Sequence, residues 1–277
     1  MAKDKVFAPF KMPDYRVIRP SIFLEKGGNT VAAIQQISSF HIGKCKIEFI
    51  TPNPITLFFN KSWKEYEQAL EIYKTTIKPN LNEEKSFVVN DTQLSALYDY
   101  LELIQSSIIA IYSAVEALSN AAIPSDYTLK RKNNKGIEET WTKENIERWD
   151  QTTEKIGKIV PEILSFESPK SQSFWEGFMG LKELRDDIIH QKQSKKDPNN
   201  IEQSHLYLLL SESVFTKILS GFALIKYCCE KNQTHTYFPM LNDEIPVDVN
   251  MVDSFDGIFE WTTNSPIQTF VNSNKSG

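Results

Sequence analysis

The sequence contains little cysteine and no long hydrophobic run. It has three cysteines in 277 residues; two of them, Cys228 and Cys229, are adjacent, and Cys45 is remote from both. This spacing gives no disulfide framework, so we expect reduced and buried thiols. No apolar run reaches the roughly 18 residues that span a bilayer, and residues 1–16 lack the hydrophobic region of a signal peptide. These absences predict a cytoplasmic protein.

There is also no excess of basic charge, since 31 lysines and arginines stand against 36 aspartates and glutamates. The formal net charge is -5, and the isoelectric point is near 5.5. Broad, non-specific coating of nucleic acid needs a basic surface, so this composition argues that any polyanion is held locally. With 40% hydrophobic and 24% charged residues, the chain has an ordinary globular composition. It is long enough for one large domain or for a domain with an extension.

The motifs of the common metal and nucleotide sites are absent from the sequence. No two of the four histidines lie three or four residues apart, and none forms a ligand-spaced pair with a cysteine; they are His41, His190, His205 and His235. We therefore expect no metal and no other cofactor. There is no G-x-S-x-G, Walker or protein-kinase motif, which argues against the conventional hydrolases and phosphotransferases.

The first 90 residues mix strand and helix signals. Short apolar runs separated by prolines predict strands at residues 22–24, 47–50 and 55–59. Gly27 and Gly28 are candidates for a hairpin turn. Large apolar residues at helical spacing then predict a helix over residues 62–77, with Ser62 as its N-cap. We interpret residues 1–90 as a β-rich or mixed N-terminal extension.

The longest regular pattern predicts a helix from Asp91 to residue 123, where Pro124 stops it. Apolar residues recur there at alternating steps of three and four: Leu94, Leu97, Leu101, Ile104, Ile108, Ile111, Val115, Leu118 and Ala122. Such a seam over roughly four heptads is typical of the central helix of a bundle. Glu116 lies beside this seam.

Further helices are predicted after a polar insert. We interpret the insert, residues 125–136, as a solvated loop because it carries a run of lysine and arginine; a nucleic-acid contact is the alternative. Helical patterns follow at residues 143–149, 153–159, 174–193 and 200–225. Residues 236–277 have the pattern of an extended arm, with pairing to the N-terminal strands as one option. The predicted fold class is mainly α, with a helical bundle over residues 91–235.

One of these helices places charge in an unusual position. In residues 174–193, apolar side chains gather on one arc: Phe174, Phe178, Leu181, Leu184, Ile188 and Ile189. Arg185 falls inside this arc. A guanidinium among apolar side chains needs an anionic or hydrogen-bonding partner, and Glu116 is a candidate counter-charge. His190 points to the opposite, polar side, which it shares with Asp186.

The run KELRDDIIHQK resembles the Arg-x4-6-His motif of the HEPN superfamily (higher eukaryote and prokaryote nucleotide-binding). The resemblance extends over roughly residues 91–231: a long helix containing IIAIYSAVEALSNAAIP, the later helix with the motif, and a final long helix. It implies an HEPN-like helical bundle, which in many members is a metal-independent ribonuclease active as a dimer. It also implies that Arg185 and His190 form the active site, with Asp186 in the polar position that follows the arginine.

The chemistry of these residue types fits RNA cleavage. Attack by the RNA's own 2′-hydroxyl needs a base, an acid and positive charge beside the phosphate. Histidine is the residue type suited to the proton transfers, which makes His190 the candidate, and Asp186, one turn earlier, can orient the imidazole. Arg185 suits the phosphate. Three further candidates for substrate binding follow the histidine: Lys192, Lys195 and Lys196.

Helix geometry complicates such a site. Five residues along an ideal helix place Arg185 and His190 about 140° apart. Either the helix loosens near Ile189, or a second copy supplies the matching groups; we predict a homodimer with a composite site. The structural alternative is that Arg185 is a buried arginine paired with Glu116, while His190 caps carbonyl groups at the helix end.

Two functions follow from these alternatives. The first is a metal-independent endoribonuclease with RNA as its substrate, as a toxin or phage-defence effector, with an antitoxin or another regulator as its partner. The second is a non-catalytic HEPN-like module that binds a nucleotide or a protein partner. The acidic isoelectric point favours the second function, and the lysines near His190 favour the first. In toxin-type members a modified tyrosine lies two residues after the histidine; Lys192 occupies that position, which argues against a nucleotidyltransferase partner.

Overall fold

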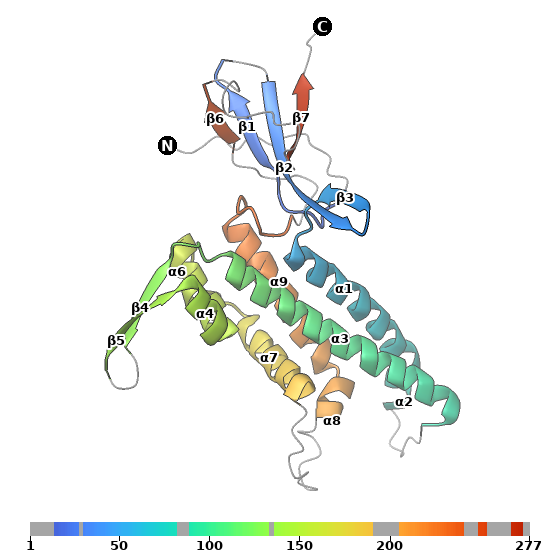
Figure 1. The fold of residues 1–277 in the computed structure, drawn as a ribbon. Coiled ribbons are helices and arrows are strands. Elements are labelled where there is room, and N and C mark those ends of the chain that lie inside the picture. The colour runs from blue at the N-terminus through green and yellow to red at the C-terminus, as the bar shows by residue number, and fades with distance from the viewer. Residues whose placement is uncertain are drawn as a thin grey trace. The chain divides into compact units, whose positions relative to one another are not determined.

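The computed structural model describes residues 14–27, 30–81, 89–132, 136–190, 205–240, 249–253 and 267–273. The chain divides into two compact units: Leu57–Cys228, and Met1–Thr56 together with Cys229–Gly277. The first unit is a helical bundle, and the second contains a small sheet (Figure 1). The predicted fold class, mainly α with a strand-containing N-terminal region, is confirmed. The division differs from the three consecutive segments expected, because the first helix joins the bundle and the C-terminal strands join the sheet.

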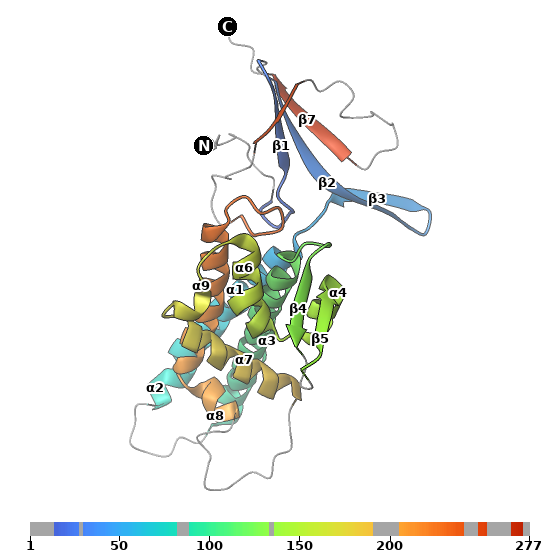
Figure 2. The same ribbon diagram turned by 90° about the vertical axis from the view of Figure 1, so that its left-hand side faces the viewer.

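The sheet combines strands from both ends of the chain (Figure 1 and Figure 2). β1 (Ser21–Glu25) and β2 (Thr30–Ile42) pair antiparallel, and Gly27 in the turn after β1 has a φ of +73°, which favours glycine. β2 also pairs antiparallel with β3 (Cys45–Ile50) and β7 (Ile267–Ser273), whereas β6 (Val249–Val252) runs parallel to β1. The C-terminal arm therefore does pair with the N-terminal strands.

Within the same unit, Arg19 binds a later part of the chain. Its guanidinium donates hydrogen bonds to the backbone carbonyls of Gln233 and Pro239. His235 packs on Phe238 with ring centroids 4.2 Å apart, and burial together with the Arg19 charge lowers the pKa of His235 to about 4. A neutral imidazole is therefore part of the packing of this unit at neutral pH.

The first helix begins earlier than expected. α1 (Pro54–Ile72) continues through a π-helical turn (Tyr73–Ile77) into α2 (Lys78–Leu81). The strand predicted at residues 55–59 is wrong, because Asn53 caps this helix. Its side-chain oxygen accepts hydrogen bonds from two of the first backbone amides, and proline suits the first helical position.

α3 (Asp91–Ala121) is the long helix that the sequence predicted. Its N-cap is Asn90, and Asn90 forms a capping box with Gln93, so Asp91, which the pattern favours as the N-cap, is the first residue of the helix. Reciprocal hydrogen bonds between Ser62 and Ser107 join α1 to α3, so Ser62 is not an N-cap. The apolar seam is fully buried at Ile104, Ile108, Ile111, Val115 and Leu118.

α3 is also long and apolar enough to cross a membrane, with a mean hydropathy of 1.4 over 18 residues. Half of that stretch is buried inside the protein. The core helix of a soluble protein has the same length and composition. The finding is therefore compatible with a soluble protein.

The polar insert forms a hairpin instead of the expected loop. β4 (Thr128–Lys132) pairs antiparallel with β5 (Glu138–Thr142). Exposed and half-buried residues alternate along both strands. Leu129 and Trp141, from the half-buried positions, pack against a core cluster of Ile123, Ile146 and Ile159. A hairpin with one half-buried face therefore replaces the solvated loop, because these two side chains find a core to cover.

Short helical segments follow the hairpin. α4 (Lys143–Trp149) has the predicted bounds. The helix predicted at residues 153–159 is longer in the structure, where it comprises α5 (Thr152–Glu154), a π-helical turn (Lys155–Ile159) and α6 (Val160–Leu164). A 3-10 turn, Pro169–Ser171, leads to the next helix.

The remaining helices of the bundle pack around α3; they are α7 (Trp175–His190), α8 (His205–Leu210) and α9 (Ser213–Lys231). Tyr112 of α3 stacks on Phe178 of α7, with ring centroids 6.0 Å apart. Gly221 of α9 lies so close to α3 that an added Cβ would approach Ile111 to 2.7 Å. Because no side chain fits there, this glycine allows the helices to approach closely.

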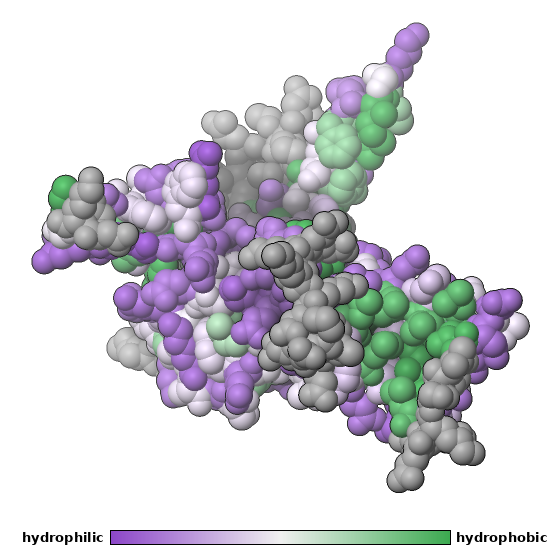
Figure 3. All heavy atoms as spheres, turned by 90° about the horizontal axis from the view of Figure 1, so that it is seen from below, coloured by the Kyte–Doolittle hydropathy of each residue, from purple (hydrophilic) through white to green (hydrophobic). Residues whose placement is uncertain are grey.

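One end of the bundle carries a hydrophobic surface. Figure 3 shows apolar side chains gathered at the end that α2, α8 and the start of α3 reach in Figure 1 and Figure 2. Leu81 of α2 is 53% exposed, and Leu206 of α8 is 45% exposed. Exposed apolar residues that gather in one place often mark a contact surface.

Candidate functional site

Arg185 lies in α7 with its guanidinium close to the surface. Its side chain is 27% exposed, and its Nη1 donates a hydrogen bond of 3.0 Å to Oδ1 of Asp186, the next residue. The guanidinium carbon lies 5.0 Å from the centre of the Tyr112 ring of α3. An anion and an aromatic face thus satisfy the charge that the sequence placed among apolar neighbours.

Asp186 binds two cations of its own helix. Besides Arg185, Lys182 one turn earlier donates from Nζ to Oδ2 of Asp186 at 2.8 Å. Partial burial alone would raise the pKa of Asp186, but the hydrogen bonds from Lys182 and Arg185 outweigh it and lower the pKa. The bond to Asp186 raises the pKa of Lys182. Asp186 is therefore a carboxylate that positions two cationic side chains.

The aromatic floor beneath Arg185 is buried. Burial raises the pKa of Tyr112, and a hydrogen bond to the side chain of Thr152 opposes that rise. Phe178 stacks on Tyr112, and Trp175 packs on Phe178 in turn. Because these rings fix α7 against α3, the position of Arg185 is set by the core.

The structure pairs Arg185 with Asp186 and not with Glu116, the candidate counter-charge. Glu116 lies one turn further along α3 than Tyr112, and its charge acts on a different cation, Lys155. Burial lowers the pKa of Lys155, and the charge of Glu116 is the largest of those that oppose the shift. A core ion pair between Arg185 and Glu116 is thus replaced by a pair within α7.

Lys155, unlike the partly exposed Arg185, is a buried cation, with 1% of its area exposed. Its Nζ donates to Asn120 Oδ1 at 2.6 Å and to the Glu147 carbonyl at 3.4 Å. Nearby, Lys143 donates to the backbone carbonyls of Asn120 and Ile123. Both lysines therefore satisfy polar groups at the C-terminal end of α3, where positive charge is favourable.

His190 is the last residue of α7 and is exposed. The helix remains α-helical up to it, so it does not loosen near Ile189. Ile189, expected on the apolar arc, is 48% exposed, whereas Ile188 is buried. Arg185 and His190 therefore project from one regular helix in different directions. The three predicted substrate-binding residues lie outside the described residues: Lys192, Lys195 and Lys196.

Two side chains of the site were not predicted from the sequence. Lys182 precedes Asp186 by four residues, which is the spacing of an ion pair within a helix, so this contact can be predicted from the sequence. Tyr112 lies on another helix, and only the packing of α7 on α3 brings its ring under Arg185. Over the described stretches of the chain, no three histidine, cysteine, aspartate or glutamate side chains gather in a way that could hold a metal ion.

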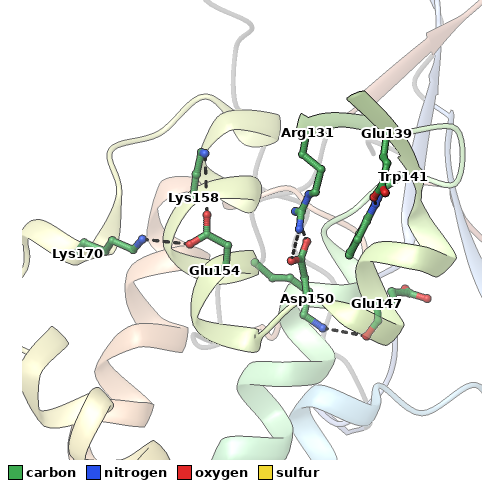
Figure 4. A network of polar contacts seen from close by, with 9 residues as sticks. Arg131, Glu139, Trp141, Glu147, Asp150, Glu154, Lys158 and Lys170 are labelled. Atoms are coloured by element: carbon green, nitrogen blue, oxygen red, sulfur yellow. Dashed lines mark hydrogen bonds and ion pairs between the residues drawn. The ribbon is translucent and has the colours of Figure 1, made fainter. Parts of the chain in front are cut away.

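A second polar network lies beside the hairpin and extends to the segment after α4 (Figure 4). Arg131 of β4 and Asp150 form a bidentate pair at 2.8 and 2.6 Å, and the Trp141 ring lies 4.1 Å from the guanidinium carbon. Close by, Glu154 pairs with Lys170 of the 3-10 turn. Arg131 is therefore bound within the protein, which argues for a structural role at this point of the basic run.

Comparison with protein families finds a similarity that includes the α7 site. The family model described as the YopA C-terminal domain matches residues 90–212. The matched stretch begins at the N-cap of α3, ends just after α8, and contains both Arg185 and His190. No curated protein and no solved structure matches the chain. The site thus lies in a region similar to that domain, whereas the sheet and α1 lie outside the match.

Proposed function

We propose that the chain is a metal-independent endoribonuclease of HEPN type. The proposal rests on the motif resemblance of the run from Arg185 to His190, and the environment of Arg185 supports it. Of the five guanidinium donors, the hydrogen bond to Asp186 engages Nη1, and the side chain remains partly exposed. A guanidinium held in this way is oriented for an incoming phosphate.

Each residue has a defined role in the proposed reaction. The O2′ atom attacks the adjacent phosphorus, the bond from phosphorus to the 5′-oxygen breaks, and the products are a 2′,3′-cyclic phosphate and a 5′-hydroxyl. His190 transfers protons, either from the 2′-hydroxyl or to the leaving 5′-oxygen. Arg185 binds the phosphate, and Asp186 positions Arg185. We assign contacts with neighbouring phosphates to Lys192, Lys195 and Lys196.

The proposed site forms between two copies of the chain. Arg185 and His190 are separated by about 7.5 Å along the helix axis and by about 140° around it, so one helix does not direct both at one phosphate. The exposure of Ile189 beside His190, and of Leu206 on the neighbouring α8, supports a self-contact at this end of the bundle. In a homodimer, the partner helix supplies the missing group.

The cellular role we propose is that of a cytoplasmic toxin or phage-defence effector. The support is the HEPN resemblance, since many ribonucleases of that superfamily act in this way. An RNase of this kind harms its own cell when unrestrained, so an antitoxin or another regulator is expected to hold it inactive.

The direct test is RNA cleavage in the presence of EDTA. We expect the purified protein to cut a labelled single-stranded RNA and leave a 2′,3′-cyclic phosphate. His190→Ala and Arg185→Ala should each lower the rate at least about 100-fold, the usual contribution of general acid-base or electrostatic catalysis. His41→Ala and Arg148→Ala are matched controls, because both residues are exposed and lie on other elements. Cleavage that survives in His190→Ala would refute the proposal.

A non-catalytic module that binds a nucleotide is the second candidate. The observation that favours it is that Asp186 and the Tyr112 ring already satisfy Arg185 without any substrate. If this candidate holds, no RNA is cleaved under any condition, while a nucleotide raises the melting temperature of the wild type and not of Arg185→Ala.

A further inference from the structure

A groove runs along the seam between α1 and α3. Two adjoining hollows, with volumes of about 760 and 360 Å³, form it, and Glu102 and Ser106 line both. The lining residues of α1 lie along one face of the helix: Phe58, Lys61, Glu65, Gln68, Glu71 and Ile72. Those of α3 also lie along one face: Asp99, Glu102, Leu103, Gln105, Ser106, Ile109 and Ala110. Each helix therefore presents one continuous stripe to the groove.

The floor of this groove is apolar. Ile72, Leu103 and Ile109 are half-buried along it, and Ile188 of α7 is buried at one end. At that same end Phe58 is exposed. Apolar side chains that remain accessible in a concave surface provide the free energy for docking another apolar face.

The rim of the groove is acidic. Glu71, Asp99 and Glu102 are exposed. Glu65 lies deeper: its Oε1 accepts a hydrogen bond of 3.0 Å from Ser106 and pairs with Lys61, while its Oε2 is buried and has no hydrogen-bond partner. Four carboxylates thus face one lysine, and a buried carboxylate oxygen lacks the donor that it needs.

We propose that this groove docks a basic amphipathic helix of a partner protein. The stripe from Phe58 to Ile72 covers 15 residues with a rise of about 21 Å, which matches a partner helix of about 14 residues. Leucine-like residues at positions i, i+3, i+4 and i+7 of the partner fill the floor, and flanking lysine or arginine side chains meet the carboxylates. This inference is independent of the proposed ribonuclease activity.

The charge distribution also argues against other occupants. RNA is a polyanion, so the four carboxylates repel it. A second copy related by two-fold symmetry would place this same acidic rim against itself. The carboxylates concentrate at the end near Glu71 and Asp99, so the partner helix is expected to direct its basic residues and its positive N-terminal dipole to that end.

The test uses a fluorescein-labelled 14-residue peptide of leucine and lysine with one apolar stripe. A scrambled peptide of the same composition, which has no stripe, is the reference probe. We expect the striped peptide to bind the full-length protein in fluorescence anisotropy, and the scrambled peptide to bind at least ten-fold more weakly. Peptides that bind with equal affinity would overturn the proposal, because the attraction would then be one of charge alone.

Matched variants locate the binding. Asp99→Lys combined with Glu102→Lys should lower the affinity for the striped peptide at least ten-fold, and Phe58→Ser should lower this affinity to a smaller extent. Glu67→Lys combined with Asp126→Lys changes the net charge equally at exposed positions outside the groove and should leave the affinity unchanged. Equal affinities of the two double variants would place the peptide elsewhere and refute the proposal. A groove variant that changes only the oligomeric state, with no peptide bound to the wild type, would also refute it.

Discussion

Two cationic clusters in the bundle differ in how their partners are supplied. Around Lys155 and Arg131, the partners come from different elements: Lys155 binds Asn120 of α3, and Arg131 of β4 binds Asp150 after α4. Lys155 and the Asp150 carboxylate are buried, whereas Arg131 is partly exposed. On α7, Arg185 and Lys182 bind one carboxylate of their own helix at a partly exposed position.

This difference separates a structural role from a functional one. Contacts that join distant parts of the chain form only on folding, so their loss reduces stability. Ion pairs between neighbouring side chains on the surface of one helix stabilise it weakly, by a few tenths of a kcal/mol each. The α7 cations are therefore the ones that the protein can use for binding without losing its fold. Four predictions test this comparison.

The largest effect on stability is expected for Lys155→Ala. The change leaves Asn120 Oδ1 without its donor and opens a cavity, so the free energy of unfolding should fall by about 3 kcal/mol. Lys155→Met keeps most of the volume and should lose about 1 kcal/mol less. The measurement is urea denaturation followed by circular dichroism. Lys158→Ala, an exposed lysine of the same turn, is the control and should lie within about 0.5 kcal/mol of the wild type.

A somewhat smaller loss is expected for Asp150→Ala. The Asp150 side chain is 8% exposed and accepts both hydrogen bonds of the bidentate pair, so its removal should cost about 2 kcal/mol. Glu138→Ala, which removes an exposed carboxylate of the same hairpin, should cost less than about 0.5 kcal/mol. Equal losses in the two variants would show that the buried pair contributes no more than the surface pair.

Arg185→Ala should lower the free energy of unfolding by less than about 1 kcal/mol, because its ion pair is partly exposed and local. RNA cleavage should be lost in the same variant. A stability loss as large as that of Lys155→Ala, with no cleavage by the wild type, would contradict both the comparison and the proposed function, and would make Arg185 a structural residue.

The smallest effect is a difference in the alkaline pH dependence of stability. The pKa of Lys155 is lowered in the folded protein, so between that value and the unfolded value near 10.4 the unfolded chain binds more protons and stability rises with pH. The pKa of Lys182 is raised, so its contribution is present below the unfolded value and is lost as pH rises through the folded one.

Urea denaturation between pH 8 and 11 should therefore separate the two lysines. The free energy of unfolding of the wild type minus that of Lys155→Met should rise with pH. The same difference for Lys182→Met should fall with pH. If both difference curves rose with pH, or both fell, the pKa values of the two lysines would not be shifted in opposite directions, and the comparison between the sites would be wrong.

Much of the helical framework could be predicted from local pattern. The steps of three and four along α3 predicted its length to within two residues, because the seam of a core helix repeats every turn. The secondary-structure predictions are wrong where a hydrogen bond or a packing contact with another residue determines the local conformation. Residues 55–59 are apolar enough for a strand, but Asn53 and Pro54 start a helix there. Leu129 in the polar insert and Trp141 just after it find a core to cover, so a hairpin replaces the loop.

The candidate site shows the same limit. The proximity of Arg185 and Asp186 follows from their adjacent positions, and that of Lys182 from its spacing of one turn. The ring of Tyr112 comes from 73 residues away, and Glu116, one turn beyond it, lies near Lys155 instead of Arg185. Spacing along one helix predicts neighbours on that helix, but it does not predict which turn of another helix packs opposite.

The sequence by itself determined the mainly helical class, the central helix and the placement of a cation, a carboxylate and a histidine on one later helix, because these depend on periodicity and local capping. Only the tertiary structure decided which cation is buried, which carboxylate each cation meets and where the acidic groove lies. Those outcomes depend on how two helices pack side by side, and that packing is set by the fit of many side chains together rather than by any one motif.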